Sequence, residues 1–135
     1  MNPSRKYAVV LAAVLGFGWM VTASPVRADI KDYEFQLVQS DVKKGDGAIV
    51  AVRLVNKKTD KPVSNAVISA KRIDMAPDGM AEMAPRIELL PSNDPGVYRF
   101  KTNLSMEGRW QLSIGAKVQG ETGTVESKLV VKATP

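Results

Sequence analysis

The residues of this sequence whose chemistry stands out are methionines gathered close together. Met75, Met80 and Met83 share one segment, and Met106 lies four residues before Trp110. Proline and glycine interrupt the shared segment, which indicates a loop. Thioether sulfur is a soft, neutral donor that suits Cu(I), and by the same reasoning Ag(I), better than harder divalent ions. The pattern therefore indicates a loop that holds a soft univalent ion, with the Trp110 ring as a cation–π neighbour.

The same residues also have a purely structural interpretation. Methionine fills irregular gaps in apolar cores, and a long loop folded over one end of a domain needs such side chains. Trp110 is in phase with Leu112 and Ile114, a pattern typical of the buried face of a strand. From the residues alone, metal binding and core filling both remain open.

Three carboxylates, Asp74, Asp78 and Glu82, are interleaved with the methionines. They could offset the charge of a bound cation without coordinating it, but solubility of the loop is the simpler interpretation. Elsewhere the acidic residues do not show the spacing of a calcium-binding loop.

Histidine and cysteine are both absent from the sequence. Their absence excludes the Ser-His-Asp triad, cysteine nucleophiles and the usual zinc ligand sets. No sequence feature selects a pair of carboxylates for acid–base chemistry. We therefore do not expect an enzyme.

The N-terminus has the three zones of a secretory signal peptide. Arg5 and Lys6 are followed by an uncharged, mostly apolar run from residue 7 to residue 21 and by small residues up to Ala28. We expect cleavage after Ala28, which gives a signal peptide over residues 1–28 and one domain over residues 29–135. The alternative is an uncleaved anchor, but a spanning helix needs roughly 20 apolar residues, more than this run provides.

Charge and hydropathy then describe the exported part. Three of the 19 basic residues and none of the 14 acidic ones lie in residues 1–28, so the mature chain carries only a small positive excess. This balance does not indicate nucleic-acid binding, which usually involves a clustered basic face. No later segment is apolar enough for a stable membrane span. We expect a secreted protein, in the periplasm of a Gram-negative bacterium.

The mature sequence is divided into short runs of alternating apolar and polar residues, separated by turn residues. No segment has a sustained helical period. Seven such runs in about 100 residues indicate an all-β protein, an immunoglobulin-like antiparallel β-sandwich. The expected strands are 33–39, 48–56, 66–73, 86–90, 97–102, 109–118 and 124–132, with 42–47 expected as a turn.

Four short motifs in this order resemble the YtkA-like or FixH-like domain family. They are Lys61–Ala66, the methionine-containing loop, Pro95–Tyr98 and Met106–Leu112, and the resemblance spans 33–132. The resemblance implies an immunoglobulin-like sandwich outside the cytoplasm and a link to copper. It also implies that Met75, Met80, Met83 and Met106 hold the metal, with Trp110 beside them.

The resemblance further implies partners. Such domains occur alone, beside heavy-metal efflux adaptors and in accessory proteins for cytochrome oxidase assembly. FixH-like proteins are typically anchored in the membrane, so the expected cleavage favours a free periplasmic protein. We therefore expect a Cu(I)- or Ag(I)-binding protein that serves metal resistance or delivers the ion to an efflux adaptor or a cuproenzyme. The alternative is a sandwich that binds no metal and acts through protein contacts with such a membrane complex.

Overall fold

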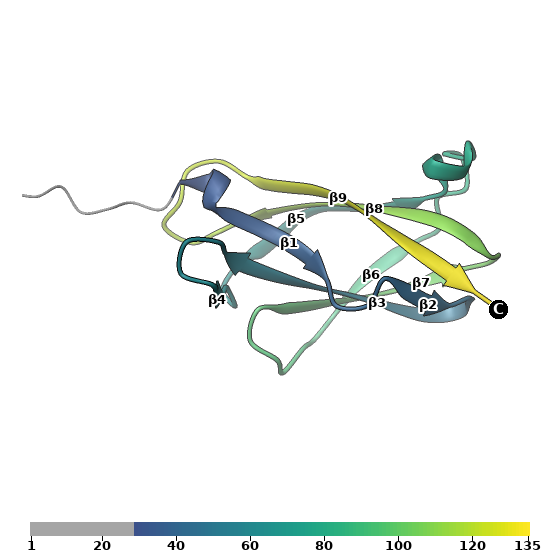
Figure 1. Ribbon diagram of the computed structural model, residues 1–135, viewed down its shortest axis with the longest axis horizontal. Coiled ribbons are helices and arrows are strands. Elements are labelled where there is room, and N and C mark those ends of the chain that lie inside the picture. Colours follow the sequence, from purple (N-terminus) through teal and green to yellow (C-terminus); the bar gives the residue numbers. More distant parts are fainter. Residues whose placement is uncertain (1–28) are drawn as a thin grey trace, which may run out of the picture.

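Alternating apolar and polar residues form two β-sheets in the computed structural model, which describes residues 29–135 (Figure 1). The expected signal peptide and its cleavage site after Ala28 lie outside the described residues. The elements are the 3-10 helix η3 (Ile30–Asp32), β1 (Tyr33–Leu37), β2 (Asp41–Lys43), β3 (Gly45–Asn56), β4 (Lys61–Pro62), β5 (Val67–Asp74), the 3-10 helix η4 (Ala76–Asp78), β6 (Ile87–Leu90), β7 (Val97–Leu104), β8 (Gly108–Lys117) and β9 (Val125–Thr134).

The two sheets are those of an all-β sandwich, as expected. One sheet has the order β1-β3-β7-β6, with β4 paired to β3, and the other has the order β2-β9-β8-β5. All strand pairs are antiparallel except β2 and β9, which are parallel. Among the described residues, no helix is long and apolar enough to cross a membrane.

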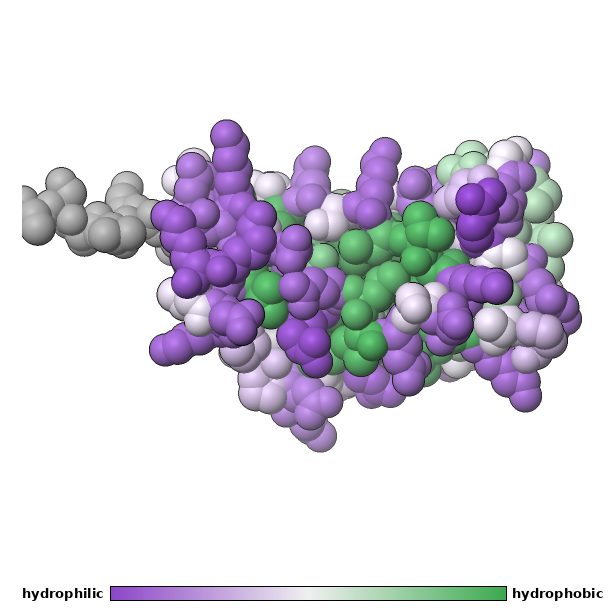
Figure 2. All heavy atoms as spheres, viewed as in Figure 1, coloured by the Kyte–Doolittle hydropathy of each residue, from purple (hydrophilic) through white to green (hydrophobic). Residues whose placement is uncertain are grey.

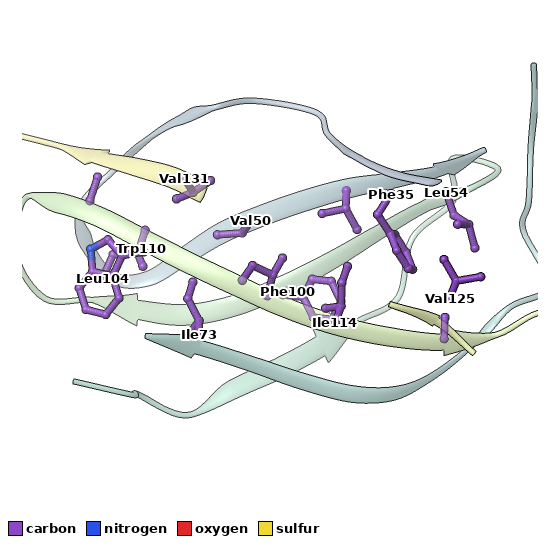
Figure 3. Packing of buried hydrophobic residues seen from close by; sticks show 14 of the residues in the cluster. Phe35, Val50, Leu54, Ile73, Phe100, Leu104, Trp110, Ile114, Val125 and Val131 are labelled. Carbon is purple, nitrogen blue, oxygen red and sulfur yellow. The ribbon is translucent and has the colours of Figure 1, made fainter. Parts of the chain in front are cut away.

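The core lies between the two sheets. Figure 3 shows Trp110 and Ile114 from β8 pointing toward Val50 and Phe100 of the opposite sheet. Alternation along the strands accounts for this arrangement, because successive side chains of a strand point to opposite faces. The chain has no cysteine, so no disulfide adds to this apolar contact.

The seven expected strands are all present, but the prediction of a turn over residues 42–47 is wrong. Asp41–Lys43 forms β2, and β3 already begins at Gly45. β2 adds to the edge of β9, and a bulge between Asp46 and Ala48 lets β3 continue its pairing with β7. The turn-forming residues here connect β2 in one sheet to β3 in the other. The pairing of β2 with β9 overrides the local preference for a turn.

β1 and β2 follow one another in sequence but belong to different sheets. Leu37 and Val42, on either side of the crossing, are only partly buried against the core. Figure 2 shows hydrophobic side chains along the middle of the face on which β1 and β9 lie nearest the viewer in Figure 1. The crossing therefore covers this edge of the sandwich incompletely.

The end of the sandwich near η3 is closed by contacts of Tyr98. Its hydroxyl donates to the Val63 carbonyl at 2.8 Å and accepts from the Ala66 amide at 3.1 Å. Gly96 has a φ of 76°, and a Cβ there would lie 2.5 Å from the Cβ of Pro62. Two of the motifs noted in the sequence, Lys61–Ala66 and Pro95–Tyr98, therefore pack against each other.

We predict that Tyr98→Phe lowers the free energy of unfolding by about 1–2 kcal/mol, because two backbone groups lose their hydrogen-bond partner. Chemical denaturation measures the change. The control is Tyr33→Phe, which removes a hydroxyl that donates to Glu121 at 3.0 Å. That partner is a charged side chain that water can solvate, so we expect a smaller loss. Equal losses in the two variants would contradict this role of Tyr98.

Candidate metal site

The methionine loop lies at the other end of the sandwich from η3 (Figure 1). Its backbone hydrogen bonds join the three methionines to one another. The Met75 amide donates to the Met83 carbonyl at 3.2 Å, the Met80 amide to the Met75 carbonyl at 3.0 Å, and the Met83 amide to the Met80 carbonyl at 3.0 Å. Met75 and Met80 also form an isolated antiparallel bridge. The loop thus brings together the backbones of Met75, Met80 and Met83.

The four methionines differ in burial. Met75 is fully buried and belongs to the core, while Met80 and Met83 are partly buried against it. Met106 is 39% exposed in the turn between β7 and β8. Figure 2 shows moderately hydrophobic side chains beside strongly hydrophilic ones at the end that η4 occupies in Figure 1. The core-filling interpretation therefore holds for Met75, and metal binding by the four methionines stays a prediction.

Trp110 is fully buried between the sheets, as its phase with Leu112 and Ile114 indicated (Figure 3). Its indole N–H donates to the Met106 carbonyl at 3.1 Å. The buried tryptophan thus fixes the turn that carries Met106. A cation–π role for its ring stays a prediction.

Gly108, the first residue of β8, lies directly against the methionine loop. Its φ is 140°, and a Cβ at this position would lie 2.6 Å from the Met75 Cε and 2.7 Å from the Asp78 Oδ2. Both atoms therefore approach the same point of the backbone. The absence of a side chain at Gly108 lets the loop, the buried thioether and a carboxylate come together there.

Arg109 ties η4 to β8. Its side chain donates to the Asp78 Oδ1 at 2.8 Å and to the Pro77 carbonyl at 2.7 Å, and its amide donates to the Asp78 Oδ2 at 2.7 Å. These hydrogen bonds from Arg109, backbone and side chain, hold the pKa of the Asp78 carboxyl below its usual range. Asp78 is therefore a paired carboxylate.

Arg72 anchors the loop from β5 in a similar way. Its Nε donates to the Asp74 Oδ2 at 2.8 Å, and its Nη2 donates to the Ala81 carbonyl at 3.0 Å. Asp74 is buried, and its Oδ1 accepts from the Ala76 amide at the start of η4. Asp74 and Asp78 each form an ion pair with an arginine. The interpretation as a solvated loop carboxylate is wrong for Asp74, because that side chain is buried.

Sequence reasoning missed both arginines. Arg72 and Asp74 are two residues apart on one strand, a spacing that places their side chains on one face and could have indicated the pair. Arg109 and Asp78 are separated by 31 positions, so no local signal links them.

The donor set of this end of the domain is dominated by sulfur. Within residues 29–135, no group of three or more histidine, cysteine, aspartate or glutamate side chains could hold a metal ion. A hollow of about 460 Å³ lies elsewhere, on the outer face of β5, β8 and β9, and its lining includes Ala70, Gly115 and Lys128 but no methionine. The soft donors of the loop are neutral thioethers, and the two arginines that contact the loop, Arg72 of β5 and Arg109 of β8, are each paired with a carboxylate.

Comparisons with known proteins place the chain in a family but do not define an activity. A family model described as YtkA-like matches residues 27–115, which is more than half of the chain. Among curated proteins, none matches. Among solved structures, the domain is similar to one titled ZirS C-terminal Domain, with 12% identity, 93% of this chain and 88% of that chain covered, and a TM-score of 0.44. A copper association and a relationship to FixH stay predictions.

We predict that Gly108→Ala destabilises the domain by about 1–3 kcal/mol, because the added methyl group must displace Met75 and Asp78. The control is Gly120→Ala, which also has a positive φ of 87° but no atom within 4 Å of the added methyl group. Chemical denaturation compares the two. A Gly108→Ala variant as stable as Gly120→Ala would contradict the close docking of the loop.

Proposed function

The chain belongs to the YtkA-like family, and from this premise we propose that it is an exported protein that binds Cu(I) or Ag(I). The ligands are the thioethers of Met75, Met80, Met83 and Met106. The ion is cargo, held for metal resistance or for delivery. The methionine loop carries this function, and the sandwich serves to position it.

The observation that supports the proposal most strongly is the ring of backbone hydrogen bonds that joins Met75, Met80 and Met83. Met75 and Met80, which form an antiparallel bridge, have Cα atoms roughly 5 Å apart. A methionine side chain has three rotatable bonds and a polarizable sulfur, so such neighbours can turn their sulfurs toward one ion. If the three methionines only filled separate gaps in the core, their backbones would not need to be hydrogen-bonded to one another.

The burial of the four methionines suggests how an ion enters and leaves. Met106, the most exposed, and the partly buried Met80 and Met83 are accessible to an arriving ion. Met75 is fully buried, so it joins the coordination only after a shift of the loop. Thioethers leave the charge of the ion uncompensated, which favours exchange with a partner over permanent retention.

The remaining parts of the proposal concern place and partner. The protein acts in the periplasm after removal of residues 1–28, and it passes its ion by ligand exchange to a heavy-metal efflux adaptor or a cuproenzyme. It catalyses no reaction. The sequence has neither histidine nor cysteine, so methionine supplies its soft donors. This composition supports the assignment of the four methionines as ligands.

A second candidate function follows from the exposure of Met106. A methionine-rich surface adapts to varied partners, and Met106 with the half-buried Met80 and Met83 supplies such a surface. In this alternative the loop binds a membrane efflux or oxidase-assembly complex directly and holds no metal.

We predict that the purified protein binds one equivalent of Ag(I) and that Met80→Leu/Met83→Leu weakens binding at least tenfold, about 1.4 kcal/mol or more. Leucine keeps the apolar volume while it removes the sulfur, so the fold should be retained. Competition titration gives the affinity, and carbon-13 methyl spectra of methionine report which thioethers respond to the ion.

Val130→Met is the matched control, because it adds an exposed thioether on β9 outside the loop. It should leave the Ag(I) affinity and stoichiometry unchanged. Equal affinity in the native protein and the Met80→Leu/Met83→Leu variant would exclude the thioether site. Absence of Ag(I) binding by the native protein would leave the protein-contact function as the better account.

A further inference from the structure

Asp74 and Asp78, two of the carboxylates interleaved with the methionines, each accept hydrogen bonds on both oxygens. Asp78 accepts hydrogen bonds on both oxygens from Arg109, at 2.7 and 2.8 Å. Asp74 accepts from Arg72 on one oxygen and from the Ala76 amide on the other, at 2.8 and 2.9 Å. These charge-assisted hydrogen bonds draw electron density from the carboxylate oxygens, and the two arginine charges oppose a second cation nearby.

The position of Asp78 makes its pairing important for an ion in the loop. The Asp78 Oδ2 and the Met75 Cε lie within 2.7 Å and 2.6 Å of the same point beside Gly108. A carboxylate oxygen and a thioether group are thus neighbours. An unpaired Asp78 would convert a sulfur site into a mixed sulfur and oxygen site with one negative charge.

Such a conversion would change which ions bind. Carboxylate oxygen favours divalent ions, and Cu(II) prefers oxygen and nitrogen donors, whereas thioethers alone favour Cu(I) and Ag(I). The guanidinium of Arg109 contacts the Asp78 Oδ1 and neutralises the carboxylate charge, while the Asp78 Oδ2 accepts from the backbone amide of Arg109. The ion pair therefore makes Asp78 a weaker donor for a divalent ion.

We propose that Arg109 is a specificity-determining residue of the methionine site, which rejects Cu(II) because Arg109 withholds the Asp78 carboxylate. This inference rests on the proposed function and adds to it the discrimination between univalent and divalent ions. Arg109 contacts no metal and acts through Asp78. Its hydrogen bond to the Pro77 carbonyl keeps the guanidinium in place.

Arg72 provides a matched comparison. It also forms an ion pair and donates to a loop carbonyl, that of Ala81. Both carboxylates keep a hydrogen bond to a backbone amide when the arginine side chain is lost. Asp74, however, is buried, whereas Asp78 is partly exposed and lies beside the Met75 methyl group at Gly108. Loss of Arg72 therefore frees no accessible carboxylate beside a thioether.

The test measures Ag(I) and Cu(II) affinities of the native protein, R109Q, R72Q and the double variant R109Q/D78N. Competition titration gives both affinities, and electron paramagnetic resonance detects bound Cu(II). In R109Q we expect the Cu(II) affinity to rise at least tenfold relative to the Ag(I) affinity. The ratio should return to the native value in R109Q/D78N and stay at the native value in R72Q.

If R109Q does not fold, the same affinities are measured on R109K. Lysine keeps the charge but lacks the planar fork, so it leaves one Asp78 oxygen less engaged, and the ratio should rise by a smaller factor. A native ratio in R109Q or in R109K would overturn the proposal, as would a gain that persists in R109Q/D78N or appears equally in R72Q.

Failure of the proposed function gives a different result. Absence of Ag(I) binding by the native protein would overturn the thioether site and this specificity role together. Native Ag(I) binding with an unchanged ratio in R109Q would overturn the role of Arg109 alone.

Discussion

The contact between the apolar faces of the two sheets is the constraint on which this domain depends. No disulfide reinforces it, so the sandwich is held by burial around Trp110, Phe100 and their neighbours (Figure 3). This core extends into the methionine loop through Met75. Hydrogen bonds from side chains add to it at the two ends of the sandwich, through Tyr98 at one end and Arg72 and Arg109 at the other.

The methionine loop combines a structural and a chemical role in the same residues. Met75 completes the core, and its backbone also holds Met80 and Met83 in place. The loop can therefore present sulfur at the surface while it stays attached to a rigid strand pair. In the proposed function the scaffold supplies the position, the thioethers supply affinity for a soft ion, and the pair of Arg109 and Asp78 limits the choice of ion.

The strands could be predicted because alternation records which face is buried, as along Trp110, Leu112 and Ile114. β2 could not, because its partner β9 lies about 90 residues away and its own residues favour a turn. The location of the methionine loop was predictable from Pro77 and Gly79, but the burial of Met75 depends on its approach to Gly108. The pairing of Asp78 with Arg109 could not be predicted from the sequence either, because the two residues are 31 positions apart and only the fold brings them together.

The central claim is that an ion in this loop is bound by sulfur. X-ray absorption at the silver edge of the Ag(I)-loaded protein measures the atoms around the ion directly. We predict a first shell of sulfur atoms alone, contributed by the four methionines of the loop and the adjoining turn. A first shell of oxygen or nitrogen atoms would contradict the account, because such a shell would place the ion away from the thioethers.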